Sequence, residues 1–269
     1  MNKIVTCTPI GGLGNQLFIL CTAIAYSIDN DRRLIITNYN ETRGIDQVSI
    51  RNKYIDNLFY KLQPNIGVVK GKVYTLKEKG FFYSKLPESN HYIVHLKTYF
   101  QSYKYFEHHM EIIHNLFEFK KYQTKNNSIS LHFRIGDYKV NTNVHPILDI
   151  NYYIKSLRYI YQLTNKEYLV EYACENNDID IVNKNIEILK HYFPNFSFKR
   201  INPDLPDWKQ MIYLSSCMHN IIANSTFSWW GAYLNQNKNK IVTYPSTWFG
   251  KNIKKNTNDL FPSDWVKIK

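Results

Sequence analysis

The chain has 269 residues, of which 44% are hydrophobic and 16% are aromatic. That length predicts one large domain or two modest ones, and the aromatic content excludes a disordered chain. The formal net charge of +12 leaves nucleic acid, an anionic membrane surface and an anionic small molecule open as partners. Because the basic residues are spread out and the sequence contains no nucleic-acid-binding motif, we expect no nucleic-acid partner. Peripheral association with a membrane through the basic surface stays open.

The first half of the chain opens with a βαβ pattern. An apolar run at 3–10 predicts a strand, and 16–28 is apolar almost all round, as in a buried helix. The stretch 38–88 is less regular and predicts no definite element. The expected elements are a strand at 3–10, a loop with Gly11, Gly12 and Gly14, a helix at 16–28, strands at 33–37 and 93–100, and a helix at 105–119.

In the second half, strands and helices alternate with short loops, which is typical of a parallel, doubly wound sheet. A polar run at 122–127 separates the halves, so we predict domains at 1–125 and 126–269. The predicted fold class is α/β, with two Rossmann-like halves that have parallel sheets and face a cleft. The expected strands are 128–133, 167–174, 197–200, 219–223 and 240–244, and the helices are 151–163, 179–192, 208–217 and 226–234.

The first candidate site is the glycine loop at 11–16, which follows a predicted strand and opens a helix. Backbone N–H groups at a helix start, aided by the helix dipole, favour an anion. The glycine spacing is not that of the dinucleotide fingerprint, and no Lys-Ser or Lys-Thr follows as in a P-loop. Asn15 and Gln16 add amide groups there. The alternative is a tight turn that needs its glycines for backbone conformation alone.

The second candidate site is SISLHFRIGDY at 128–138, where a buried strand meets its loop. His132, Arg134 and Asp137 lie at that end, and ligands of open α/β sheets bind beyond the carboxyl ends of strands. Arginine is a permanently charged fork suited to a diphosphate. The alternative is a structural ion pair. Asp137 could orient Arg134, act as a base, or cap the turn, and capping is favoured.

The third candidate site lies at 221–230, where another buried strand ends at a new helix. Asn224, Ser225 and Thr226 are residues that cap helices, so capping alone explains them. Several hydroxyls beside exposed N–H groups could also hold phosphate oxygens. We expect Trp229 and Trp230 to belong to the core.

These segments together resemble a known family. GGLGNQLF at 11–18, HFRIGDY at 132–138 and HNIIANSTFSWWGAYLN at 219–235 look like the hallmark segments of the α-1,2-fucosyltransferases, glycosyltransferase family 11. The runs at 145–153 and 244–249 are also similar. The resemblance implies a GT-B-type fold and an inverting, metal-independent transfer of L-fucose from GDP-fucose. The implied acceptor is the 2-hydroxyl of a galactose in a glycan.

The resemblance also implies residue roles. Arg134 corresponds to the arginine that binds the β-phosphate of GDP, and His145 lies in a segment similar to the acceptor-side loop. The implied donor-binding residues are Gly12, Gly14, Asn15, Gln16, His132, Arg134, Asn224, Ser225, Thr226 and Phe227, and the candidate catalytic residues are Arg134, Asp137 and His145.

Two departures from the family pattern keep alternatives open. Ile135 stands where the family usually has a second basic residue, and 172–178 replaces an acidic loop that usually resembles FSDD. Another nucleotide-linked deoxysugar is therefore an alternative donor. A catalytically weakened protein that binds only a nucleotide sugar or glycan is another alternative.

No pattern of metal ligands is visible in the sequence, so we expect neither a metal nor another cofactor. The four cysteines lie in apolar segments without a CxxC pair, which indicates free thiols and a reducing compartment. No signal-peptide pattern and no apolar run of transmembrane length occurs, so we expect a cytoplasmic protein.

Overall fold

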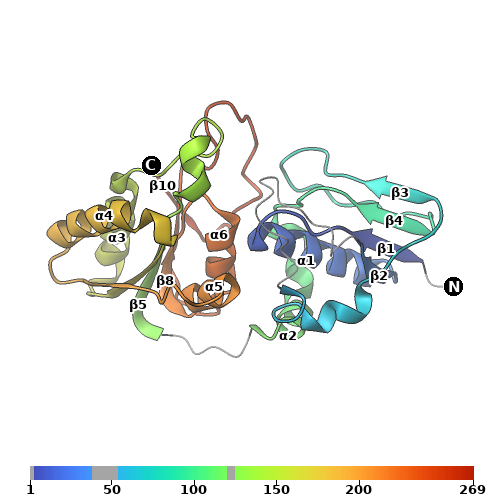
Figure 1. Ribbon diagram of the computed structural model, residues 1–269, viewed down its shortest axis with the longest axis horizontal. Coiled ribbons are helices and arrows are strands. Elements are labelled where there is room, and N and C mark those ends of the chain that lie inside the picture. Colours follow the sequence, from blue (N-terminus) through green and yellow to red (C-terminus); the bar gives the residue numbers. More distant parts are fainter. Residues whose placement is uncertain (1–2, 38–53, 120–124) are drawn as a thin grey trace. The chain divides into compact units, whose positions relative to one another are not determined.

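The computed structural model describes residues 3–37, 54–119 and 125–269. The chain forms two compact units: unit 1 is Met1–Lys121 with Lys255–Pro262, and unit 2 is Tyr122–Lys254 with Ser263–Lys269 (Figure 1). Each unit contains one parallel sheet with helices, which confirms the predicted α/β class. The predicted cleft concerns the relative placement of the two units and stays a prediction.

Unit 1 contains a four-stranded parallel sheet in the order β2-β1-β4-β3. Helix α1 connects β1 to β2 as predicted, and its residues from Leu13 to Tyr26 are buried except Asn15. Strand β3 was not predicted, because three of its four residues are exposed and no apolar alternation marks it. The bounds are β1 Ile4–Cys7, α1 Leu13–Asp29, β2 Arg33–Ile36, β3 Val73–Leu76, β4 Ile93–Leu96 and α2 Met110–Leu116, with 3-10 helices at Tyr60–Asn65, Tyr103–Tyr105 and Glu107–His109.

The glycine loop is shorter than predicted, because α1 begins at Leu13 and takes Gly14, Asn15 and Gln16 into its first turn. Gly11 makes the turn with a φ of 75°, and the Gln16 N–H donates to the Gly12 carbonyl at 3.0 Å. The helix hydrogen-bond ladder therefore starts before the third glycine.

Unit 1 also includes the segment Lys255–Pro262, which the predicted division assigned to the C-terminal half. Asp259 anchors it: its carboxylate accepts from the Tyr83 N–H at 3.0 Å and pairs with Lys104 at 2.5 Å. Its carbonyl accepts from the Ser102 hydroxyl at 2.6 Å. These contacts span more than 150 residues of sequence, so no local pattern could reveal them.

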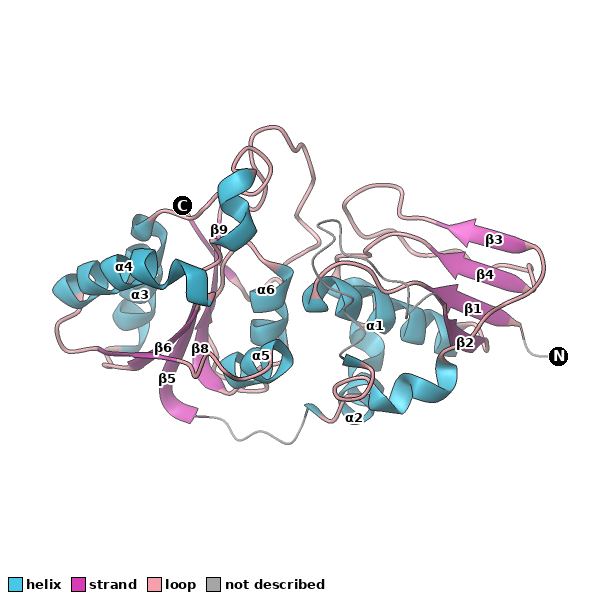
Figure 2. Ribbon diagram, viewed as in Figure 1, coloured by secondary structure: helices cyan, strands magenta, loops and turns pink. Residues whose placement is uncertain are grey.

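Unit 2 contains a six-stranded parallel sheet in the order β10-β9-β8-β5-β6-β7. Helices α3 and α4 cover one face, and α5 and α6 cover the other (Figure 2). Strand β10 was not predicted, since it is a three-residue edge strand. The bounds are β5 Lys125–His132, α3 Ile150–Thr164, β6 Leu169–Ala173, α4 Ile179–Tyr192, β7 Ser197–Arg200, α5 Asp207–Ser215, β8 Cys217–Ile221, α6 Thr226–Tyr233, β9 Val242–Pro245 and β10 Val266–Ile268.

The order of strands in unit 2 is that of the Rossmann fold, in which the chain winds outward in both directions from a switch point. Here the switch point lies between β5 and β8, and their register pairs Leu131 with Ile221. Arg134 follows Leu131 by three residues and Asn224 follows Ile221 by three. The second and third candidate sites therefore flank the switch point.

The core of unit 2 contains Trp229 and Trp230, both fully buried, as predicted. All four cysteines are free thiols, and three of them are buried. Over the residues that the structure describes, no helix combines the length and the apolar character needed to cross a membrane.

Candidate functional site

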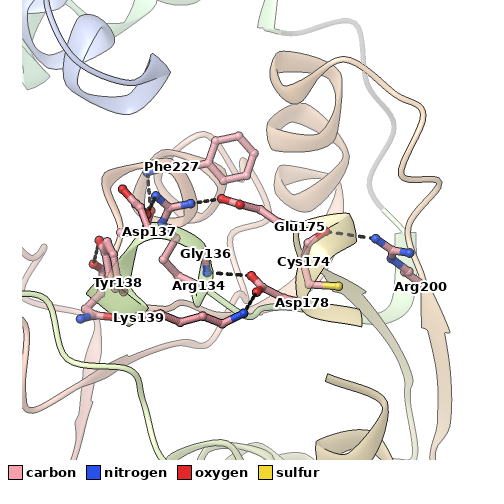
Figure 3. A network of polar contacts seen from close by, with 12 residues as sticks. Arg134, Gly136, Asp137, Tyr138, Lys139, Cys174, Glu175, Asp178, Arg200 and Phe227 are labelled. Atoms are coloured by element: carbon pink, nitrogen blue, oxygen red, sulfur yellow. Dashed lines mark hydrogen bonds and ion pairs between the residues drawn. The ribbon is translucent and has the colours of Figure 1, made fainter. Parts of the chain in front are cut away.

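Arg134 is the centre of the candidate site in unit 2. Its guanidinium donates to the carboxylates of Asp137 and Glu175, which lie on two sides of it (Figure 3). It also lies over the Tyr138 ring, with Cζ 4.9 Å from the ring centroid. Burial would lower the pKa of Arg134, but Asp137, Tyr138 and Glu175 outweigh that effect and raise it. The guanidinium is therefore a fixed positive charge at the carboxyl end of β5.

The loop that carries Arg134 is held by a buried carboxylate. Asp178, 1% exposed, accepts from the Gly136 N–H at 2.7 Å and from the Lys139 ammonium at 2.6 Å. Gly136 has a φ of 29°, and a Cβ there would lie 2.7 Å from a carboxylate oxygen of Glu175. The positive φ therefore favours glycine at this turn, and a side chain there would also have to displace the Glu175 carboxylate.

Tyr138 connects the two sides of the switch point. Its hydroxyl donates to the Asn224 carbonyl at 2.9 Å, just beyond β8. Its ring stacks on His145, with centroids 4.8 Å apart and planes 19° apart. The structure thus brings Arg134, His145 and Asn224 around one aromatic ring.

The start of α6 forms the other side of the site. The Ser225 hydroxyl accepts from the Phe227 N–H at 3.3 Å, so Ser225 is the N-cap that its residue type predicts. The Asn224 side-chain amide donates to the Pro146 carbonyl at 2.9 Å and to the Trp248 carbonyl at 3.3 Å. Asn224 therefore holds the loop after His145 against the end of β8.

His132 is buried at the end of β5, with its ring 5.3 Å from that of Phe227. Burial, and secondly the charge of Arg134, lowers the pKa of His132 to about 3. His132 is therefore neutral at neutral pH and adds no second positive charge beside Arg134.

The depressed pKa of His132 predicts a pH dependence of stability. Between its ordinary value near 6.5 and its folded value near 3, the unfolded chain binds the extra proton, so stability falls as pH falls through this window. We expect His132→Asn to flatten the dependence of the free energy of unfolding on pH by up to about 1.4 kcal/mol per pH unit. Urea unfolding at several pH values measures it. His191→Asn, at an exposed position, is the control, and equal slopes in all three proteins would contradict the prediction.

Asp137 and His145 occupy different environments. The Asp137 carboxylate is 57% exposed and is engaged by Arg134, which favours orientation of the arginine over capping or base chemistry. His145 is partly buried and stacked on Tyr138. Asp137 therefore contacts Arg134 directly. His145 is connected to Arg134 through the ring of Tyr138, which contacts both.

The glycine loop belongs to unit 1, so its predicted approach to the donor stays a prediction. Within unit 1, the Gln16 side chain donates to the Gly11 carbonyl at 3.0 Å and stabilises its own loop. Asn15 accepts from Gln101 at 2.8 Å, which ties the loop to the segment after β4. No sequence signal indicated Gln101.

Three further residues of the site were not predicted: Glu175, Asp178 and Lys139. Glu175 and Asp178 lie 41 and 42 residues from their partners in the Arg134 loop. The available signal was the parallel pairing of β5 with β6, which brings the residues after each strand to one sheet edge. Ile135 is 4% exposed and packs into the core of unit 2. The basic residues of this loop are Arg134 and Lys139.

A Rossmann-type sheet with an arginine and a helix start flanking its switch point is the arrangement of nucleotide-binding α/β proteins. The chain belongs to Glycosyl transferase family 11, whose family model matches residues 1–269. The protein is therefore a glycosyltransferase, as the sequence predicted.

Two Escherichia coli proteins are similar to nearly the whole chain. O-antigen biosynthesis glycosyltransferase WbnK is 28% identical over 311 residues, covering 96% of this chain and 98% of that protein. Alpha-1,2-colitosyltransferase is 28% identical over 294 residues, covering 99% of each. Among solved structures, fucosyltransferase NodZ from Bradyrhizobium aligns with a TM-score of 0.46 and 12% identity over 87% of this chain and 94% of that one.

Proposed function

We propose that the protein transfers L-fucose from GDP-fucose to the 2-hydroxyl of a galactose-type acceptor in a glycan, with inversion and without a metal. Family membership supports glycosyl transfer. The observation that carries the donor-binding part is the position of Arg134, at the switch point and opposite the start of α6. That position combines a forked cation with helix N–H groups, which suits a diphosphate.

In the proposed reaction, negative charge accumulates on the departing diphosphate as the bond to the sugar breaks. The Arg134 guanidinium and the N–H groups at the start of α6 would stabilise that charge. Asp137 and Glu175 carry two negative charges against the single positive charge of Arg134, so a diphosphate must displace at least one of them. Their side chains are 57% and 52% exposed, and each can turn into solvent at little cost.

The acceptor hydroxyl must lose its proton as the new bond forms. His145 and Asp137 are the groups we propose to assist, and His145 is favoured because Asp137 is engaged by Arg134. Its ring stacks on Tyr138, which also lies under the guanidinium, so acceptor and donor groups are linked through one side chain.

The similarity to one relative supports an alternative donor. Alpha-1,2-colitosyltransferase is a relative of this chain, so the sugar in its name is the alternative donor. Arg134 would serve either donor equally, since both sugars leave from a diphosphate. The choice between them depends on contacts with the sugar ring and not on the cluster around Arg134.

A panel of nucleotide sugars tests the proposal. We expect GDP-fucose, or GDP-colitose as the alternative, to raise the melting temperature more than UDP-sugars, because a ligand at 100 times its Kd stabilises the folded state by about 2.7 kcal/mol. Transfer to a galactoside is then followed by mass spectrometry, and NMR of the product gives the anomer. Turnover that persists in EDTA supports a reaction without a metal.

The results of the panel distinguish the proposed function from its alternatives. GDP-fucose binding without GDP release in the presence of galactosides would indicate the weakened, binding-only alternative. A preference for UDP-sugars would contradict the proposed donor class. Arg134→Ala should lose the stabilisation, while Arg158→Ala, an exposed position on α3, should keep it.

A further inference from the structure

Three potential metal ligands of unit 1 converge at its surface: Asp29, His108 and His109. Asp29 is the last residue of α1, and the two histidines belong to the 3-10 helix Glu107–His109. Nε2 of His109 lies 2.7 Å from Oδ1 of Asp29, and Nε2 of His108 lies 3.0 Å from Oδ2. One ligand atom from each residue falls within 4.8 Å of the other two, in the only such group of three or more among the described residues.

These separations fit a small transition-metal ion. A tetrahedral zinc ion binds nitrogen and oxygen at about 2.0–2.1 Å, which places two of its ligand atoms about 3.3 Å apart. The two His–Asp distances, 2.7 and 3.0 Å, are shorter than that value, so the side chains must move apart by a few tenths of an ångström to bring both imidazoles and the carboxylate onto one ion. Two imidazoles and a carboxylate are also a ligand set that zinc accepts.

The electrostatic surroundings favour a cation. Asp29 ends α1, where the helix dipole is negative and a carboxylate is unfavourable. The two oxygens of its carboxylate face the Nε2 atoms of His108 and His109. A cation bound between these atoms would offset the unfavourable position of the carboxylate at the end of the helix.

Two of the three residues are accessible to an ion from the surface, while His109 is 18% exposed. The side chains of Asp29 and His108 are 44% and 46% exposed, and both line a surface hollow of about 430 Å³. Lys104 lines the same hollow, but its ammonium is paired with Asp259 at 2.5 Å. The remaining charged side chains of the hollow, Lys85 and Glu88, have opposite signs.

We propose that Asp29, His108 and His109 bind a divalent transition-metal ion of the zinc type, with its remaining position open to solvent. The ion would link the end of α1 to a segment about 80 residues further along the chain. This site belongs to unit 1, and the role we propose for the ion is to stabilise that unit.

Zinc titration of the untagged full chain tests the proposal. After removal of metal with a chelator, the protein competes with a chromogenic chelator for Zn²⁺. We expect one zinc ion per chain and a melting temperature that rises with zinc concentration. His108→Ala, His109→Ala and Asp29→Asn should each weaken zinc binding by about tenfold or more, since even outer-shell changes cost 10–100-fold.

His191→Ala is the matched control, because it removes an exposed imidazole in unit 2. Its zinc affinity should equal that of the wild type. The proposal is overturned if the wild type binds no zinc up to about 1 mM, or if the three site variants bind as tightly as His191→Ala. Melting temperatures without zinc confirm that each variant is folded, so a weaker affinity reports loss of a ligand.

Discussion

Replacing Arg134 by alanine is expected to lower kcat by about a hundredfold or more. In the proposed reaction this change removes the forked cation that would face the diphosphate, and one preorganised donor to developing charge contributes about 2.7–4 kcal/mol to the barrier. Arg134→Lys should recover only part of the activity, because an ammonium cannot make two parallel hydrogen bonds. Steady-state kinetics with saturating donor measure both variants.

Stability measurements separate this effect from unfolding. The carboxylate partners of Arg134 are more than half exposed, so their ion pairs contribute about 1 kcal/mol or less and the variants should stay folded. Arg158→Ala removes an exposed arginine from α3 and should keep wild-type turnover. Near-normal kcat in Arg134→Ala would exclude the diphosphate role.

The architecture of unit 2 was largely predictable, because each buried strand is a short apolar run and each following helix has its own periodicity. Alternation of such elements leaves few topologies other than a parallel sheet. The missed strands, β3 and β10, are edge strands of four and three residues whose side chains are mostly exposed or half-buried. Their conformation depends on pairing with β4 and β9 and not on their own residues.

The site was predictable where its residues are contiguous. Arg134 stands out as a charge at the end of an apolar run, and Ser225 stands out as a cap before a helix. Glu175 could be identified only as part of an acidic loop, because its contact with Arg134 depends on the register of β5 with β6. The cluster of Asp29 with the two histidines could not be predicted from the sequence, because its contacts join residues that are 79 and 80 positions apart.

Asp178 holds the loop that carries Arg134, and its loss should destabilise the fold. Asp178 is buried and accepts from two donors of the loop, the Gly136 N–H and the Lys139 ammonium. Asp178→Ala leaves both donors without this acceptor. Hydrogen bonds that involve a charged group contribute about 1.5–3 kcal/mol to stability. The bond from Lys139 should contribute less than the bond from Gly136, because solvent screens the Lys139 side chain, which is 40% exposed.

We therefore expect Asp178→Ala to lower the free energy of unfolding by about 3 kcal/mol and Asp178→Asn to lower it less, since an amide oxygen can still accept from Gly136. Asp180→Ala, two residues further on and exposed, should cost less than about 1 kcal/mol. Urea unfolding compares the three. Because the same loop holds Arg134, the KM for the donor should rise in Asp178→Ala more than in Asp180→Ala. Equal effects on stability and on KM would mean that Asp178 does not position the arginine, and that Glu175 and Asp137 suffice to hold it.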